Sequence, residues 1–431
     1  MSKEAHDRRR TFRVLGASVA AVALFATAGC SASSDSGSAD GDVVLEFAQW
    51  WEPELPDGAF RELMDEFEKE NPGITVELLS GPYASTKEQL FAGAAAGTMS
   101  DVVGLDGAWV SDFANQGAIA DLTELMAESD YDDSELASQI KIDGATYMIP
   151  VVNFVYPMFT NDDLLAQAGV AAAPTNRTEF AAAANAVAGL GEDTSGWILP
   201  LSLEAPNGIQ NDVMSWVWAS GGSMLDEDGQ PDVTNGDVTS AVEYVKGLWD
   251  DGAIAPGAFT MKEQDKVEEF TNGRVGMMID SLAHINLIRE SNPDLNFSIS
   301  ALPADDGFDG ERGIPYASWG IGVADSSEHK AEAFKLVEFL MSEETNSKLS
   351  SIANAFPGNT ESVPDFVTED ELFATAFEIY QNGYPANEFT GLPVAEQLMR
   401  LFDEQFQVLL DGGQSVDETL EKTQEAWLAE F

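Results

Sequence analysis

The sequence predicts an α/β protein built around a parallel β-sheet, and two features of the pattern from residue 43 onward indicate this. Short apolar runs alternate with longer amphipathic segments, and polar or glycine-containing stretches separate the two kinds of segment. Repeated alternation of strand and helix favours parallel strands, with helices covering both faces of the sheet.

The first strand is expected over residues 43–48, followed by an amphipathic helix over 60–70 with Phe60, Leu63, Met64 and Phe67 on one stripe. Asn71-Pro72-Gly73 ends this helix, and residues 74–79 form the next strand. The order strand, helix, strand is the basic unit of a parallel sheet.

The alternation continues with helices over 87–96 and 110–116 and a strand over 101–105. In open α/β sheets, ligands bind beyond the carboxyl ends of the strands. The loops expected at that edge are 50–52, 80–83 and 106–109.

The pattern changes after residue 146. Extended segments are expected at 146–153, 197–201, 276–280 and 298–303. Helices are expected at 178–190, 212–220, 238–251, 330–341 and 343–352, with another ending at 267–271. The C-terminal tail is expected to be wholly helical, and residues 226–229 are interpreted as a hairpin turn rather than a calcium loop.

The N-terminus predicts export. Residues 1–29 combine a cationic start with an apolar run over 14–27 that is too short to span a bilayer. Cys30 follows Thr27-Ala28-Gly29, which resembles a bacterial lipobox, in which the cysteine becomes the lipidated N-terminus, although Thr27 stands where such motifs usually carry Leu. Residues 30–42 then form a Ser/Gly/Asp tether.

Two alternatives for this segment stay open. The first is a plain signal peptide that contains a cysteine. The second concerns the export route, because Arg9-Arg10-Thr11-Phe12 resembles a twin-arginine signal but Arg13 replaces its usual Leu. Cys30 is the only cysteine, so the folded body has neither a disulfide nor a thiol nucleophile.

The chain is strongly acidic, with 75 Asp plus Glu against 21 Lys plus Arg and a net charge of −54. Removal of residues 1–29 takes away five cations and two anions, which brings the net charge to −57. Such a surface repels nucleic acid and anionic lipid headgroups, so neither is an expected ligand. High external salt and a lineage-wide acidic bias both remain possible reasons.

Several ordered motifs resemble one family. The stretch FTNGRVGMM at 270–278 is similar to a Phe-x-x-Gly-x-x-x-Met motif in which a glycine ends a helix and the chain turns into a strand. Further matching pieces lie at 147–150 before 160–164, at 320–324 before the helix at 330, and at 354–359. Over residues 43–431 the chain resembles the extracellular solute-binding proteins of ABC importers, in the group with maltose- and multiple-sugar-binding members.

The resemblance implies a type II periplasmic-binding-protein-like fold, in which two α/β lobes joined by crossover segments close like a hinge on a ligand cleft. One lobe would combine 43–152 with 304–349, the other 153–301 with 350–431, with crossings near 151–154, 298–303 and 350–356. It implies capture of a sugar by a monomer on the outer face of the cytoplasmic membrane and delivery to the transporter's permease. A neutral solute is expected because Arg312 and Arg274, the cations that could meet an anionic ligand, form no cluster that would select a phosphate or carboxylate. Neither a cofactor nor a metal is expected, and no catalysis.

A sugar site needs aromatic platforms and polar side chains for the hydroxyl rim. Trp50, Trp51, Trp109 and Trp319 lie where loops should face the cleft, although packing in the core is an equally good interpretation of each. Trp216 and Trp218 are expected in the core.

The polar candidates are Glu52, Tyr83, Asp106, Asn153, Glu204, Asn207, Asp280 and Ser281, with Asn387 and Glu396 as weaker ones. Asp106 and Asp280 each follow an apolar strand at its carboxyl end, where exposure to a cleft is expected, and helix N-capping is the alternative role for both. The hypothesis is that Trp50, Trp51, Asp106 and Asp280 close on one saccharide from opposing lobes.

Enzyme motifs are missing from the sequence. His6, His284 and His329 are too scattered for a metal site or a triad, and there is no nucleophile elbow, phosphate loop or dinucleotide fingerprint. Two rival functions remain: a secreted glycoside hydrolase, because many carboxylate pairs are available, and a surface sensor or adhesin lipoprotein of the same fold.

Overall fold

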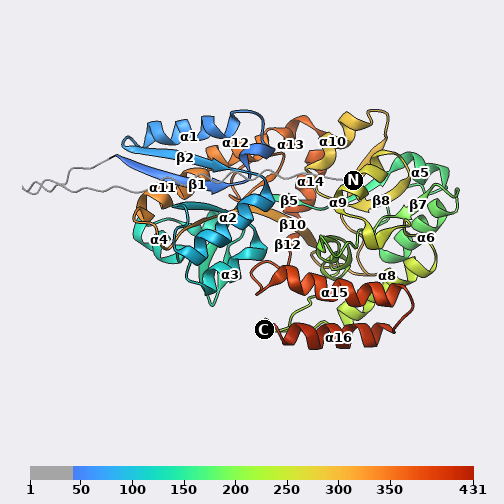
Figure 1. The fold of residues 1–431 in the computed structure, drawn as a ribbon. Coiled ribbons are helices and arrows are strands. Elements are labelled where there is room, and N and C mark those ends of the chain that lie inside the picture. The colour runs from blue at the N-terminus through green and yellow to red at the C-terminus, as the bar shows by residue number, and fades with distance from the viewer. Residues whose placement is uncertain (1–41) are drawn as a thin grey trace, which may run out of the picture. The chain divides into compact units, whose positions relative to one another are not determined.

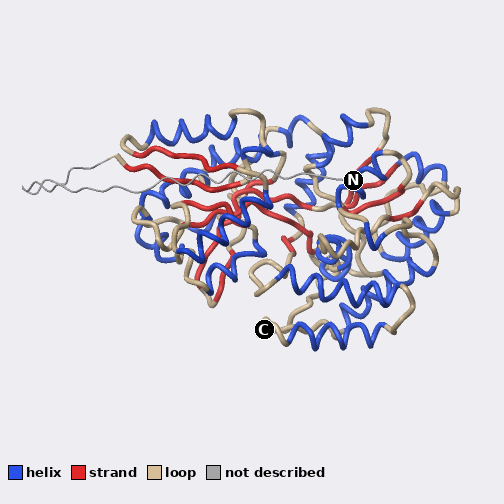
Figure 2. The backbone as a smooth tube through the Cα atoms, viewed as in Figure 1, coloured by secondary structure: helices blue, strands red, loops and turns tan. Residues whose placement is uncertain are grey.

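The computed structural model describes residues 42–431, so the predicted signal 1–29, the lipidation site Cys30 and the tether up to residue 41 lie outside the described residues. The described chain forms two separate β-sheets with helices around them (Figures 1 and 2). The large sheet has the order β11-β5-β10-β3-β1-β2, with β12 beside β10 and β4 beside β5, and the small sheet has the order β7-β8-β6-β9.

The large sheet is mixed rather than wholly parallel. β1 (Val43–Gln49) pairs in parallel with β2 (Ile74–Ser80) and β3 (Val102–Leu105), which confirms the predicted strand-helix-strand unit. β10 (Gly313–Val323) is antiparallel to β3 and to β5 (Ala145–Val155). The prediction of a parallel sheet was incomplete because these two strands come from outside the early alternating segment. The remaining strands of this sheet are β4 (Ile140–Ile142), β11 (Phe356–Pro357) and β12 (Tyr384–Ala386).

Helices cover the large sheet on both sides: α1 (Ala59–Glu70), α2 (Tyr83–Ala96), α3 (Val110–Asn115), α4 (Leu122–Ser129), α11 (Lys330–Leu340) and α12 (Glu343–Ala353). The apolar stripe predicted on α1 is buried, as expected for an amphipathic helix. α2 begins at Tyr83 rather than at residue 87, so Tyr83 belongs to a helix and not to the preceding loop.

The small sheet consists of β6 (Met158–Asn161), β7 (Ser195–Trp197), β8 (Val275–Ile279) and β9 (Phe297–Ser300). Its helices are α5 (Asp162–Gln167), α6 (Arg177–Ala188), α9 (Glu263–Thr271), α10 (His284–Ser291), α13 (Phe366–Glu369) and α14 (Glu371–Gln381). β7 ends at Trp197, and residues 198–201 are buried without continuing the strand.

A helical layer packs beside the small sheet: α7 (Ser215–Trp218), α8 (Gly236–Asp250), α15 (Ala395–Leu410) and α16 (Val416–Leu428) (Figure 1). Trp216 and Trp218 are 0% and 1% exposed, which confirms that they belong to the core. The helix predicted over 212–220 is instead a π-helical turn, η4 (Ile209–Val213), followed by α7.

The tail is not wholly helical, because β12 pairs in parallel with the start of β10. With three residues, one of them a proline, β12 is too short for its sequence pattern to reveal it. The predicted turn at 226–229 is confirmed, since Asp226 N donates to Gln230 O at 2.9 Å and Leu225 pairs antiparallel with Pro231.

The chain passes between the two sheets more than once. β5 of the large sheet leads through Tyr156 and Pro157 directly into β6 of the small sheet, and β9 leads back through residues 301–312 into β10. One hydrophobic core lies around the large sheet, and two lie around the small sheet and the helical layer.

Candidate ligand-binding site

We call the large sheet with its covering helices the large-sheet body, and the small sheet with its helices and the helical layer the small-sheet body. A small polar cavity of about 80 Å³ lies where these two bodies meet. The large-sheet side supplies Tyr83, Asp106, Gly107, Ala108, Ala317 and Ser318. The other side supplies Tyr156, Asn207, Gln210, Asn211, Asn387, Thr390, Glu396 and Met399. Hydroxyl and amide groups predominate in this lining, and among these described residues none is basic.

Asp106 directly follows the carboxyl end of β3 and lies in the cavity wall. Its Oδ1 accepts a hydrogen bond from Ala108 N at 2.9 Å, which makes Asp106 the N-cap of the short helix η2 (Gly107–Trp109), and its Oδ2 accepts one from the Tyr83 hydroxyl at 3.2 Å. Both roles considered for Asp106, capping and facing the cavity, therefore occur together. Desolvation raises the pKa of its carboxyl, although the hydrogen bonds from Ala108 and Tyr83 oppose this.

The π-helical turn η4 brings Gln210 and Asn211 to the cavity, with Asn207 just before it. The turn depends on Gly208, because a Cβ at that position would lie 1.6 Å from Pro200 O. π-helical turns are rare and occur often at functional sites. The helical periodicity of the sequence contains no signal for such a turn, which is why Gln210 and Asn211 were not predicted.

The segment before α15 forms the opposite rim of the cavity. Asn387 Nδ2 donates to Tyr316 O at 3.0 Å, and Gly391 N donates to Gly107 O at 3.0 Å. Gly107 is in close contact with Thr390, since a Cβ on Gly107 would lie 2.5 Å from Thr390 Cγ2. This segment therefore touches the large-sheet body directly at the cavity.

The predicted tryptophans form one buried cluster behind Tyr83. Trp50, Trp51, Trp109 and Trp319 are 3%, 0%, 1% and 5% exposed. The rings of Trp51 and Trp319 stack on each other at 5.6 Å, and the Tyr83 ring lies 5.3 Å from Trp50 and 5.0 Å from Trp109. None of the four tryptophans lines the cavity, so Tyr83 is the member of the cluster that faces it.

Several other predicted residues also lie outside the cavity lining. Ser80 Oγ donates to Glu52, and Asn153 is buried with its Nδ2 3.3 Å from the Tyr380 hydroxyl. Glu204 is exposed and pairs with Lys262 at 2.6 Å.

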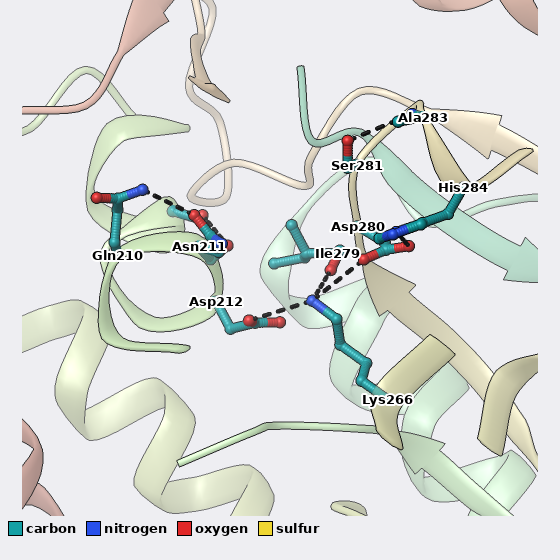
Figure 3. A network of polar contacts seen from close by, with 10 residues as sticks. Gln210, Asn211, Asp212, Lys266, Ile279, Asp280, Ser281, Ala283 and His284 are labelled. Carbon is teal, nitrogen blue, oxygen red and sulfur yellow. Dashed lines mark hydrogen bonds and ion pairs between the residues drawn. The ribbon is translucent and has the colours of Figure 1, made fainter. Parts of the chain in front are cut away.

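Asp280 and Ser281 take part in a buried network instead (Figure 3). Asp280 is 0% exposed, its Oδ1 lies 3.5 Å from Lys266 Nζ, and its Oδ2 lies 2.8 Å from His284 Nδ1. Ser281 Oγ accepts a hydrogen bond from Ala283 N at 3.3 Å.

Of the principal candidates, the structure therefore brings Tyr83 and Asp106 to the cavity, together with Asn207 and the weaker candidates Asn387 and Glu396. Sequence reasoning missed Tyr156, Gln210, Asn211, Ser318, Thr390 and Met399. Ser318 directly precedes the candidate Trp319 on β10, and side chains alternate along a strand, so this neighbour could have been considered.

A larger groove of about 450 Å³ borders the cavity and shares Ala108 and Glu396 with it. Lys87 Nζ of α2 lies 2.5 Å from Glu396 Oε1 of α15, so this ion pair bridges the two bodies at the boundary.

The part of the chain that the structure describes is residues 42–431. Within this range no group of three or more His, Cys, Asp or Glu side chains is arranged to hold a metal ion. No helix in the same range has both the length and the apolar character required to cross a bilayer.

The family model described as bacterial extracellular solute-binding protein matches residues 52–347. A Brucella abortus protein whose name describes it as a binding protein is 29% identical over 340 residues, which cover 78% of this chain and 80% of that protein. An uncharacterized lipoprotein of Streptomyces antibioticus is 25% identical over 365 residues, which cover 80% of this chain and 76% of that protein.

The fold also matches solved structures. The cyclic alpha-maltosyl-1,6-maltose binding protein of Arthrobacter globiformis superposes with a TM-score of 0.76 at 20% identity, covering 90% of this chain and 99% of that one. At this identity the likeness concerns the fold, which is that of two-lobed periplasmic binding proteins, as the sequence predicted.

Proposed function

Because the chain belongs to the family of bacterial extracellular solute-binding proteins, we propose that it captures a neutral carbohydrate outside the cell and delivers it to the permease of an ABC transporter. In this proposal the cavity around Asp106 and Asn211 is the centre of the solute site. The large-sheet body and the small-sheet body are the two lobes that close on it.

The chemistry of the cavity lining carries the proposal. Amides and hydroxyls both donate and accept hydrogen bonds, which is what a rim of sugar hydroxyls requires. The two carboxylates in the lining, Asp106 and Glu396, accept from hydroxyls and repel anions, and the described lining contains no basic group for a phosphate or carboxylate. A sugar-binding protein among the solved structures of this fold supports the same ligand class.

Hinge motion is the mechanism that we propose for entry. A cavity of about 80 Å³ is well below the ~300–1,000 Å³ of typical ligand pockets, so the two lobes must separate before a saccharide enters. We place one lobe at 43–152 with 304–349 and the other at 153–301 with 350–431. The separate hydrophobic cores and the direct passages from β5 to β6 and from β9 to β10 support this division.

Lipid anchoring through Cys30 is part of the proposal, supported by the cysteine's position after residues 27–29 and by the lipoprotein relative. A Cys30→Ser variant expressed in a bacterial host should pass from the membrane fraction to the medium or periplasm and lose labelling by a fatty-acid analogue. Unchanged labelling of the variant would contradict the anchor and leave the binding function untouched.

The experiment that tests the binding function uses the chain from Ser31 onward. Its melting temperature is measured against mono- and oligosaccharides, amino acids and glycerol phosphates, because a ligand that binds the native state raises it. A saturable shift with one saccharide class, and recovery of that saccharide intact, is the expected result. A shift only with amino acids or glycerol phosphates would overturn the carbohydrate assignment, and recovery of cleaved sugar would identify a hydrolase.

A matched pair of variants locates the site. Gln210→Ala removes an amide from the cavity lining, whereas Gln89→Ala removes the same group from an exposed position on α2. Calorimetric titration should show weaker saccharide binding for the first variant only. Equal affinities for both would place the solute elsewhere.

A further inference from the structure

Lys266 is a buried lysine close to the candidate site. It does not line the cavity, so contact with a solute does not account for its burial. Its ammonium is 0% exposed and donates to Ile279 O at 2.6 Å, with Asp212 Oδ2 at 3.4 Å and Asp280 Oδ1 at 3.5 Å (Figure 3). Burial disfavours the charged amine, yet the attraction of Asp212 and Asp280 raises the pKa of Lys266 above its usual value. The two carboxyl groups therefore favour the charged form of Lys266.

The partners of Lys266 belong to two different walls of the same region. Asp212 lies in η4, directly after Gln210 and Asn211, which line the cavity. Asp280 directly follows β8. The three side chains join the π-helical turn to the carboxyl end of a strand in the small sheet, as Figure 3 shows.

The residues that follow β8 are hydrogen-bonded to the segment in which the chain crosses from β5 to β6. Asp280 N donates to Pro157 O at 3.2 Å, and Leu282 N donates to Val155 O at 3.0 Å. Tyr156, between these two acceptors, lines the cavity. One continuous set of contacts therefore runs from Gln210 and Asn211 through Lys266 to Tyr156.

Stability alone is a poor explanation for such a cluster. Desolvation of buried ions costs about as much as their pairing returns, and apolar replacements of buried ion pairs are often equally stable. A buried charge cluster does impose a definite geometry, because each carboxylate must stay close to its cation. Asp212 and Asp280 are both 0% exposed, so bulk solvent does not reach either carboxylate.

We infer that Lys266 is a positioning residue of the solute site. It fixes the position of the π-helical turn, which carries Gln210 and Asn211, relative to the crossover that carries Tyr156. The inference rests on the proposed function, since positioning these side chains matters only if they contact the solute. Lys266 itself does not touch the cavity; it acts through Asp212 and Asp280.

The decisive variant is Lys266→Met combined with Asp212→Asn. Lys266→Met alone leaves two buried carboxylates without their cation and can fail to fold. The double variant replaces the lysine and one of its two carboxyl partners with neutral side chains, and Asp280 keeps His284 at 2.8 Å as its partner. Lys246→Met is the matched control, because it removes a lysine of α8 whose partner, Asp250, is exposed.

Hydrogen exchange of the ligand-free protein is the first measurement, and it needs no ligand. The amides of residues 209–213 and 280–282 should exchange at least tenfold faster in the double variant than in the parent, while those of α16 remain unchanged. A lysine that contributed only global stability would raise exchange throughout the small-sheet body. That result, or exchange within twofold of the parent at these amides, would overturn the inference.

Calorimetric titration with the saccharide found in the panel is the second measurement. The double variant should bind at least tenfold more weakly, and Lys246→Met within twofold of the parent. Unchanged affinity together with faster local exchange would also overturn a positioning role. If no saccharide binds the parent, the proposed function fails, and hydrogen exchange still decides whether Lys266 holds the turn.

Discussion

Tyr83 connects the cavity to the aromatic cluster at the scale of single residues. Its ring packs against Trp50 and Trp109, and its hydroxyl donates to Asp106 at 3.2 Å. Tryptophans that are at most 5% exposed offer no free face to a sugar in this conformation, and they instead fix where the Tyr83 ring lies.

The Tyr83→Phe variant should bind the saccharide about fivefold more weakly, because it loses one hydrogen bond worth about 1 kcal/mol and keeps the ring. Tyr131→Phe, far along the chain on the loop after α4, is the matched control. Isothermal titration calorimetry measures both. Equal affinities would show that the Tyr83 hydroxyl does not help to orient Asp106.

A second residue-scale prediction concerns Asp403, which is 0% exposed on α15 and accepts a hydrogen bond from Gln407 at 3.2 Å. Burial raises the pKa of its carboxyl from 3.8 to about 7. Between these pH values the folded state keeps a proton that the unfolded state releases. The contribution of Asp403 to stability is therefore fully present below about pH 4 and is lost as the pH rises towards 7.

Asp403→Asn should remove this pH dependence. The variant should resemble the parent at pH 3.5, where Asp403 is protonated in both the folded and the unfolded state, and exceed its unfolding free energy at pH 8 by about 1 to 4 kcal/mol. Urea unfolding at both pH values measures this. Asp411→Asn, an exposed site just after the same helix, is the control, and a parent-like pH profile for Asp403→Asn would contradict the assignment.

At the scale of elements, the sequence pattern predicted best where a helix or strand has one face buried and the other exposed. α1 is the clearest case, with its apolar stripe buried as predicted. Prediction was poorer for short or irregular elements. β12 has three residues, and η4 replaces a regular helix with a π-helical turn that depends on Gly208 lying against Pro200 O.

Gly247 on α8 offers an element-scale test. It is exposed within a regular helix, and a Cβ there would meet no heavy atom within 4 Å. Gly247→Ala should raise the unfolding free energy by about 0.5 to 1 kcal/mol, because alanine loses less backbone entropy in a helix. Gly196→Ala, whose Cβ would lie 2.2 Å from Ala184 O, should lower it, and thermal melting distinguishes the two.

At the scale of the whole molecule, Gly107 and Thr390 are a point where the large-sheet body touches the segment before α15. A Cβ on Gly107 would lie 2.5 Å from Thr390 Cγ2 and 2.8 Å from its Oγ1. With Gly107 and Thr390 in these positions, only a residue without a side chain fits at position 107.

Gly107→Ala should therefore weaken saccharide binding about tenfold, because the closed geometry becomes strained, while the melting temperature without ligand changes little. Thr390→Ala in the same chain removes both clashing atoms, so the double variant should bind about as tightly as Thr390→Ala alone, which serves as the reference because Thr390 also lines the cavity. Titration of the single and double variants measures this. A double variant as weak as Gly107→Ala alone would show that the Gly107–Thr390 contact does not limit closure.

The sequence by itself was sufficient for the early strand-helix-strand segment and for the family that the ordered motifs indicate, because both depend on local periodicity and short motifs. Two of the residues that it proposed, Tyr83 and Asp106, line the cavity, since the parallel strands β2 and β3 on either side of β1 end at the same edge of the sheet. Only the tertiary structure decided that Trp51 is covered by Trp319, and that Gln210, Asn211 and Tyr156 meet at the cavity. These side chains come from segments far apart in the chain, and their meeting depends on how the two bodies pack, which no local pattern contains.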